Sequence, residues 1–110
     1  MKKLFLLLIV TILLVGCGKV KSKLDQILEK NNYIIVDVRT EEEFNETHVK
    51  GAINIPYDEI DEDTDLIKTK TIMVYCKSGK RSNIAYNTLK SLGYDVYDLG
   101  AYDTIDLEKE

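Results

Sequence analysis

The residues most able to do chemistry lie in one short segment, YCKSGKRS at positions 75–82. It holds one cysteine, Cys76, and three cations that follow within five residues: Lys77, Lys80 and Arg81. The thiolate is the reactive form of cysteine, and nearby cations lower the pKa of a thiol from about 8.5 into the range of about 3.5–7.5. The segment therefore predicts an ionised nucleophile beside a binding site for a small anion.

The backbone of this segment can add to the effect of the charges. Gly79 supplies the positive φ with which a short loop turns several N–H groups toward one point, forming a nest for an anion. A helix that begins behind the loop would direct the positive end of its dipole to the same point. We therefore expect residues 77–81 to surround the sulfur of Cys76. The alternative is that Cys76 is a small buried apolar residue and that the lysines are simply solvated.

Strands and helices alternate along the chain on either side of this segment. Four stretches rich in apolar and β-branched residues are expected to form strands: 33–38, 52–56, 71–75 and 95–99. Three stretches have the apolar spacing or the capping residue of a helix: 23–31 behind Ser22, a short stretch behind Thr40, and 83–93. This alternation is typical of an α/β fold in which helices cover both faces of a central, mainly parallel sheet.

The position of Cys76 in this order agrees with its chemistry. Cys76 directly follows the strand at 71–75 and precedes the helix at 83–93. Ligands of open parallel sheets bind beyond the carboxyl ends of the strands. The sequence therefore predicts a reactive thiol at the edge of the sheet where such ligands bind.

The first residues have the layout of a secretory signal peptide. Lys2 and Lys3 precede an apolar run at residues 4–15, which is shorter than the ~20 residues that span a bilayer as a helix. The run leads into LVGC at 14–17, which is similar to the lipobox of bacterial lipoproteins. That resemblance implies that a diacylglyceryl group is attached to Cys17 and that cleavage makes Cys17 the first mature residue. A plain signal peptide and a buried helix with a chance cysteine are the alternatives.

The same resemblance divides the chain into three parts. Residues 1–16 would be a lipoprotein signal peptide, and residues 17–23 would be the lipidated cysteine and a short tether. Residues 24–110 would form one domain, which is all that 110 residues allow. The mature chain would be anchored to a membrane on its extracytoplasmic side, facing the periplasm or the cell surface.

Charge and cysteine content restrict the partners of the mature chain. Without Lys2 and Lys3, 13 of the 15 basic residues remain against 19 acidic ones, a net charge of −6. The phosphates of nucleic acids repel such a chain, so we expect no nucleic-acid partner. Cys76 would be the single free thiol of the mature chain, so we expect no disulfide. We also expect a monomer that uses neither a metal nor another cofactor.

Four motifs occur in order along the predicted domain. They are DVR at 37–39, EF at 43–44, HVKGAINIP at 48–56 and CKSGKRS at 76–82. Together they resemble the rhodanese family of sulfurtransferases, and the resemblance extends from about Leu24 to Ile105. It implies a rhodanese-like three-layer sandwich. It also implies the transfer of a sulfane sulfur from a small anion such as thiosulfate to a thiol or to cyanide.

The resemblance further implies roles for the residues of the loop. Cys76 would be the nucleophile and would carry the sulfur as a persulfide, which the N–H groups of the loop stabilise. Ser78 would donate a further hydrogen bond, and Arg81 would close the loop. Lys77 and Lys80 would attract the donor anion.

Outside the loop, the resemblance implies supporting roles. Asp37 and Arg39 would form an ion pair that supports the loop, and His48 would shape a turn instead of acting as a base. The chain departs from the family near its end, where Ala101 replaces a usual glycine and Ile105 a usual tryptophan. We therefore expect the last helix of the family to be shortened or absent.

Other functions of the same loop stay open at this point. A binding or sensing module would use Cys76 to hold a persulfide or an oxidised adduct without turnover. A structural lipoprotein would retain the loop without using it. Phosphatases and arsenate reductases of the related fold have seven-residue loops, whereas Cys76 to Arg81 is six residues. Phosphatase or reductase activity is therefore the weaker enzymatic hypothesis.

Overall fold

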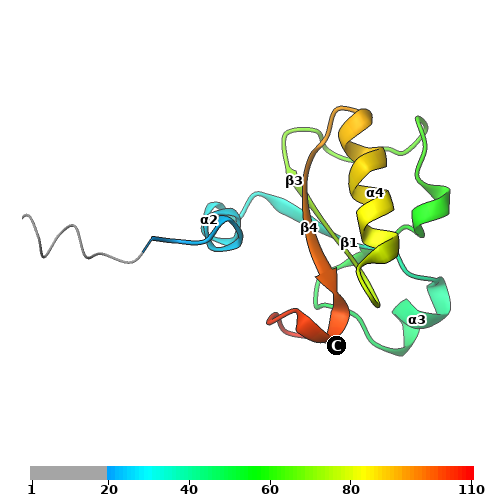
Figure 1. The fold of residues 1–110 in the computed structure, drawn as a ribbon, viewed down its shortest axis with the longest axis horizontal. Helices are drawn as coiled ribbons and strands as arrows, with labels where there is room; N and C mark the ends of the chain where they lie inside the picture. Colours follow the sequence, from blue (N-terminus) through cyan, green and yellow to red (C-terminus); the bar gives the residue numbers. More distant parts are fainter. Residues whose placement is uncertain (1–19) are drawn as a thin grey trace, which may run out of the picture.

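A four-stranded parallel sheet lies at the centre of residues 20–110, the part of the chain that the computed structural model describes (Figure 1). Its strands follow the order β2–β1–β3–β4, and each neighbouring pair is parallel. The strands are β1 (Tyr33–Asp37), β2 (Ile53–Asn54), β3 (Thr71–Cys76) and β4 (Asp95–Ala101). The helices are α2 (Lys23–Lys30), α3 (Glu41–Glu46) and α4 (Lys80–Ser91), with 3-10 turns η1 (Tyr57–Glu59) and η2 (Tyr102–Thr104).

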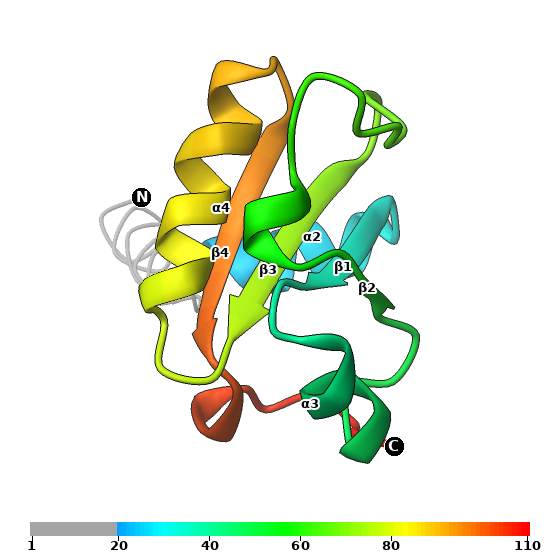
Figure 2. The ribbon, with the colours of Figure 1, turned by 90° about the vertical axis from the view of Figure 1, so that its right-hand side faces the viewer.

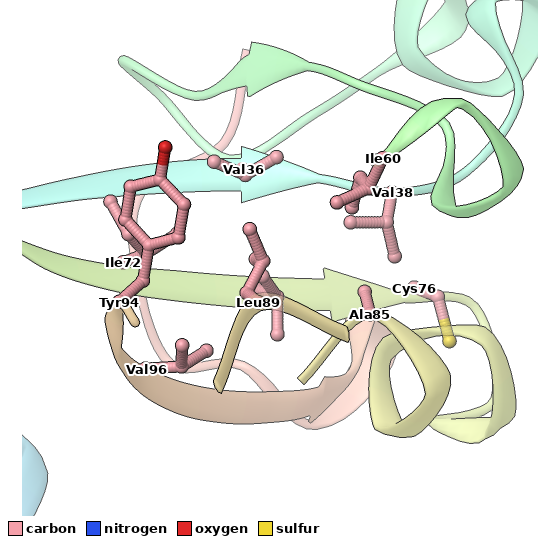
Figure 3. Close-up of a cluster of buried hydrophobic side chains, with 10 residues drawn as sticks. Val36, Val38, Ile60, Ile72, Cys76, Ala85, Leu89, Tyr94 and Val96 are labelled. Carbon is pink, nitrogen blue, oxygen red and sulfur yellow. The ribbon is translucent and has the colours of Figure 1, made fainter. Parts of the chain in front are cut away.

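Helices cover both faces of this sheet. Side chains alternate along β3, so Val74 and Cys76 pack in a buried cluster with α4, whereas Met73 packs in a second cluster with α2. Figure 2 shows α4 in front of the sheet and α2 behind it, and Figure 3 shows the cluster on the α4 side. The predicted three-layer α/β architecture is therefore confirmed.

Local capping explains where the first two described helices begin. The Ser22 hydroxyl accepts a hydrogen bond from the N–H of Asp25 at 3.1 Å, at the start of α2. At the start of α3, the Thr40 hydroxyl accepts from the N–H of Glu43, and the Glu43 carboxylate accepts from the N–H of Thr40, both at 3.2 Å. This reciprocal capping box satisfies two N–H groups that have no partner inside the helix. Both helices begin where the sequence predicts them.

The second strand is shorter than predicted. β2 contains only Ile53–Asn54 of the expected stretch 52–56. Pro56 has no N–H group and therefore cannot extend the ladder of hydrogen bonds between strands. The chain turns there into η1.

The helix behind the thiol begins earlier than predicted. α4 starts at Lys80 and not at residue 83, because Gly79 adopts a φ of 95° and turns the chain directly from the strand into the helix. Cys76 is accordingly the last residue of β3 and not the first residue of the loop. The connection between strand and helix is reduced to residues 77–79.

Within residues 20–110, a 3-10 turn and a short strand pairing follow β4, and no α-helix follows it there. The pairing joins the end of the chain to the segment before β2. The N–H of His48 donates to the carbonyl of Glu110 at 2.9 Å, and the N–H of Glu110 donates to the carbonyl of His48 at 2.8 Å. Val49 and Lys109 form an antiparallel bridge beside them.

The predictions for the first residues lie outside the described part of the chain. These are the signal peptide at 1–16 and the lipidated Cys17. The described part begins within the predicted tether at 17–23, and Lys23 opens α2. Within residues 20–110, no helix is both long enough and apolar enough to cross a membrane.

Candidate active site

Cys76 stands at the carboxyl end of β3, on the face of the sheet that α4 covers. Its side chain is completely buried, and its Sγ accepts a hydrogen bond from the N–H of Gly79 at 3.0 Å. In Figure 3 the sulfur points toward the first turn of α4. The thiol therefore lies near the positive end of the helix dipole, as the order of elements predicts.

Two opposing influences act on the pKa of the Cys76 thiol. Burial raises the pKa, because a buried charge loses its hydration. Hydrogen-bond donors near the sulfur lower it: the N–H of Ser82, the Ser82 hydroxyl, and the N–H groups of Gly79 and Ser78. Together these donors outweigh burial, so the pKa of Cys76 lies below its ordinary value.

Ser82 is a residue of this site that sequence reasoning missed. Its side chain is completely buried, and its hydroxyl donates to the carbonyl of Gly79 at 3.1 Å. A hydroxyl has one proton to donate, so ionisation of Cys76 would draw that proton from the carbonyl to the sulfur. The available signal was the motif CKSGKRS at 76–82, which ends in Ser82; a predicted helix start at residue 83 left Ser82 outside the first turn, whereas the observed start at Lys80 includes it.

The three cations of the segment lie in different surroundings. Lys77 and Lys80 are exposed, whereas Arg81 is partly buried in the first turn of α4. Within residues 20–110, neither lysine forms an ion pair. Both ammonium groups therefore remain available to an anion that approaches the loop.

Arg81, which the resemblance implies would close the loop, forms an ion pair with α3. Its Nη1 and Nη2 donate to Oε1 and Oε2 of Glu43 at 2.8 and 3.1 Å. The hydrogen bond from Arg81 is the main cause that lowers the pKa of Glu43 to about 2, and burial opposes it. This two-pronged ion pair ties the first turn of α4 to α3.

The expected ion pair between Asp37 and Arg39 is present, on the opposite face of the sheet from the thiol. Arg39 Nε and Nη2 donate to the Asp37 carboxylate at 2.6–3.0 Å, and both side chains are buried. The Tyr75 hydroxyl also donates to Asp37 at 2.9 Å, and the Arg39 guanidinium lies 4.7 Å from the ring centre of Tyr102. Within the described residues, neither side chain bonds to residues 76–81. Their link to the loop is Tyr75, the residue before Cys76.

His48 contacts α3 and the end of the chain. Its Nδ1 is 2.8 Å from the carbonyl oxygen of Phe44, and its ring stacks on that of Phe44 with 3.9 Å between the ring centres. Its Nε2 lies 3.2 Å from Oε1 of Glu110. These contacts agree with the expectation that His48 shapes the chain.

The donors gathered at Cys76 suit one small anion. The N–H of Gly79 donates to the sulfur, and the other groups that lower its pKa are N–H groups and a hydroxyl, none of which carries a negative charge that would repel an ion. Among residues 20–110, no three His, Cys, Asp or Glu side chains are grouped so that they could hold a metal ion. The arrangement can keep a thiolate ionised and can hold an anionic sulfur attached to it.

Comparisons with known proteins agree with this geometry. Residues 20–103 match the family described as Rhodanese-like domain. Over 78 residues the chain is 40% identical to thiosulfate sulfurtransferase PspE of Escherichia coli K12, covering 67% of this chain and 75% of PspE. A solved structure described as rhodanese with anions from E. coli superposes with a TM-score of 0.61 at 32% identity, covering 71% of this chain and 96% of that one. A rhodanese-related protein from Thermoplasma volcanium gives a TM-score of 0.63 at 30% identity, covering 73% and 81%. The chain belongs to the rhodanese-like family.

Proposed function

We propose that this protein is a sulfurtransferase that takes a sulfane sulfur from a small anion of the thiosulfate type and carries it as a persulfide on Cys76. The observation that carries the proposal is the 3.0 Å hydrogen bond from the Gly79 N–H to Sγ, in a loop that lowers the pKa of the thiol. A thiolate is the form that attacks sulfur. The similarity to thiosulfate sulfurtransferase PspE supports the choice of donor.

The reaction would have two steps. An electron pair of the Cys76 thiolate forms a bond to the outer sulfur of thiosulfate, the S–S bond of thiosulfate breaks, and sulfite leaves with that bonding pair. The negative charge then lies on the terminal sulfur of the persulfide. In the second step a thiolate or cyanide attacks that terminal sulfur and the Cys76 thiolate is restored. No proton moves in either step, so His48 is not needed as a base.

Residues 77–81 and Ser82, which together form the cradle of the Cys76 sulfur, would stabilise the persulfide as they stabilise the thiolate. The charge moves outward by one sulfur atom, and the N–H groups of residues 77–81, together with the Ser78 hydroxyl, would donate hydrogen bonds to it. Lys77 and Lys80, both exposed and unpaired within residues 20–110, would raise the local concentration of a doubly charged donor.

The remaining residues of the site would act as supports. Arg81 would fix the start of α4 through its ion pair with Glu43, and the N–H of Ser82 in the first turn of that helix helps to lower the pKa of Cys76. Asp37 and Arg39 fix Tyr75 from the other face of the sheet, and the backbone of Tyr75 leads directly into Cys76.

The complete burial of Cys76 favours a second candidate, a carrier that stores the persulfide for one partner without rapid turnover. The carrier would use the same cradle. Phosphatase or arsenate reductase activity is the weaker alternative, because Cys76 to Arg81 spans six residues and α4 begins as early as Lys80. A loop of that length suits one sulfur atom better than a tetrahedral oxyanion.

We also propose that the protein is a monomeric lipoprotein, anchored through Cys17 on the extracytoplasmic side of a membrane. The support for the anchor is the sequence at residues 1–17, in which two lysines, an apolar run and LVGC follow one another. The acceptor would then be a thiol or cyanide outside the cytoplasm.

Thiocyanate formation from thiosulfate and cyanide tests the proposed activity. The purified protein should form thiocyanate with two-step kinetics in which sulfite is released before cyanide is needed, and Cys76→Ser should abolish it. A protein that releases sulfite once per molecule but forms no thiocyanate would be a carrier. A protein that releases no sulfite at all would contradict both candidates.

A further inference from the structure

A surface hollow of about 550 Å³ lies at the carboxyl edge of the sheet. One wall is formed by α3, with Glu41, Phe44 and Asn45. The opposite wall comes from the segment behind β2 and from η1, with Pro56 and Glu59. The carboxyl edge is also where β3 ends in Cys76, so the hollow and the thiol open at the same edge of the fold.

The helix α3 connects the hollow to the thiol loop. Glu41, Phe44 and Asn45 are three and four positions apart, so they share one face of the helix. Glu43 lies on a neighbouring face and holds Arg81 of α4 at 2.8 Å. The same helix therefore borders the hollow on one side and the start of α4 on the other.

The floor of the hollow is held in place by hydrogen bonds. The Asn54 side chain lines the hollow, and its Nδ2 donates to the carbonyls of Asp37 and Arg39 at 2.9 and 3.0 Å. Both donor hydrogens of the amide are used, so its Oδ1 is left to accept a hydrogen bond from a ligand. The groups that remain for a ligand thus include this acceptor and the carboxylates of Glu41 and Glu59, beside the amide of Asn45.

The hollow combines negatively charged side chains with apolar surface. Glu41 and Glu59 are exposed, on opposite walls, and within residues 20–110 neither forms an ion pair. The ring of Phe44 and the ring of Pro56 supply apolar surface between them. A lysine or arginine side chain matches this arrangement, because its apolar stem can lie on the rings while its charged head reaches the carboxylates.

We infer that this hollow is the docking site of a protein acceptor, and that it receives a basic side chain located near the acceptor thiol. The hollow lies at the end of β2 and the thiol at the end of β3, with β1 between them. An acceptor that occupies the hollow while its own thiol approaches Cys76 must therefore extend over both places. A protein surface can do so. The inference rests on the proposed function, and the acidic net charge of the chain, −4, favours a basic partner.

Two synthetic peptides test the inference. Each contains one cysteine, flanked by lysines in the first peptide and by glutamines in the second. The full chain, in an uncharged detergent, is loaded with thiosulfate, and the rate of sulfur transfer to each peptide is measured. We expect the lysine peptide to accept sulfur about fivefold faster at low salt, because two exposed ion pairs form, and to lose this advantage at high salt.

Substitutions assign that advantage to the hollow. Glu41→Gln with Glu59→Gln should abolish the preference for the lysine peptide. Glu42→Gln with Glu62→Gln removes the same charge from exposed residues that do not line the hollow, and should keep the preference. Equal rates for the two peptides, or a preference that survives the first pair of substitutions, would overturn the inference.

A binding measurement separates this inference from the proposed function. Versions of the peptides with serine in place of cysteine are titrated onto Cys76→Ser protein, which can form no persulfide. Tighter binding of the lysine version that depends on Glu41 and Glu59 supports the docking site even if no sulfur is transferred. Equal binding of both versions overturns it even if thiocyanate is formed.

Discussion

The N–H of Gly79 lies 3.0 Å from the Sγ of Cys76. This contact joins the end of β3 to the start of α4, and it is made by a residue whose φ is 95°. The N–H and the hydroxyl of Ser82, in the first turn of α4, also lower the pKa of Cys76. Substitutions of Gly79 and Ser82 can therefore separate the effect of the cradle on the thiol from the stability of the fold.

Gly79→Ala should raise the pKa of Cys76 and slow sulfur uptake from thiosulfate. A Cβ at this position would come no closer than 3.9 Å to another atom, so the main penalty is the positive φ, which costs about 1–2 kcal/mol for a residue with a side chain. The backbone would shift to relieve it, and the N–H would move away from the sulfur. The ultraviolet absorbance of the thiolate, followed against pH, measures the change.

Gly51→Ala is the matched control for this prediction. Gly51 has a φ of 82°, and a Cβ added there would have no other atom within 4 Å, so alanine meets the same backbone penalty there. We expect both variants to lose a similar free energy of unfolding, and only Gly79→Ala to change the titration of Cys76. The same titration in all three proteins would refute the role of the Gly79 N–H.

Ser82→Ala should raise the pKa of Cys76 and reduce the rate of sulfur uptake by about tenfold, because an ionised sulfur loses one hydroxyl donor. The variant keeps the N–H of residue 82, so the effect should be smaller than that of removing Cys76 itself. Ser91→Ala is the control in the same helix, since the Ser91 hydroxyl donates to the carbonyl of Thr88 at the far end of α4. If both variants take up sulfur equally fast, Ser82 has no part in the cradle.

Glu43→Gln should lower the free energy of unfolding by about 1 kcal/mol at pH 7, because it removes the charge from a partly buried ion pair with Arg81. The pKa of Glu43 is about 2 in the folded chain and about 4.3 in an unfolded one, so its carboxylate stabilises the fold above pH ~4.3. That stabilisation is lost as the pH falls toward 2. Denaturant unfolding should therefore show a difference between wild type and variant that narrows from pH 5 to pH 3. If the difference in free energy of unfolding stayed constant from pH 5 to pH 3, the stabilising role of the Glu43 carboxylate would be contradicted.

Cys17 should carry the lipid anchor. In a bacterial host, the full chain should incorporate labelled palmitate, and Cys17→Ala should abolish the label, whereas Cys76→Ser should keep it. Globomycin, an inhibitor of lipoprotein processing, should trap a precursor that retains residues 1–16. A mature protein of unchanged size under globomycin would reject the lipoprotein interpretation.

The parts of the fold that depend on neighbouring residues were predictable. Ser22 and Thr40 cap their helices through hydrogen bonds to residues three positions ahead, so local sequence was enough to place both helix starts. The apolar runs of β1 and β3 likewise predicted buried strands. The start of α4 was misplaced because it is set by the left-handed φ of Gly79, and a glycine in a loop does not reveal its φ.

The contacts that connect distant segments were not predictable from patterns. Glu43 and Arg81 are 38 residues apart along the chain, and only the placement of α3 beside α4 brings them together. Without that partner, Arg81 looked like a third cation for the loop. The location of Asp37 and Arg39 on the far face of the sheet also depends on the alternation of β1, in which Asp37 and Val36 point to opposite sides.

Mass spectrometry of Cys76 tests the central claim most directly. The purified chain is incubated with thiosulfate and digested, and the mass of the peptide that contains Cys76 is measured with and without prior treatment with cyanide. We expect that peptide to gain the mass of one sulfur atom and cyanide to remove it, while Cys76→Ser protein gains nothing. A peptide whose mass stays unchanged in thiosulfate would contradict the assignment of Cys76 as the residue that carries the sulfur.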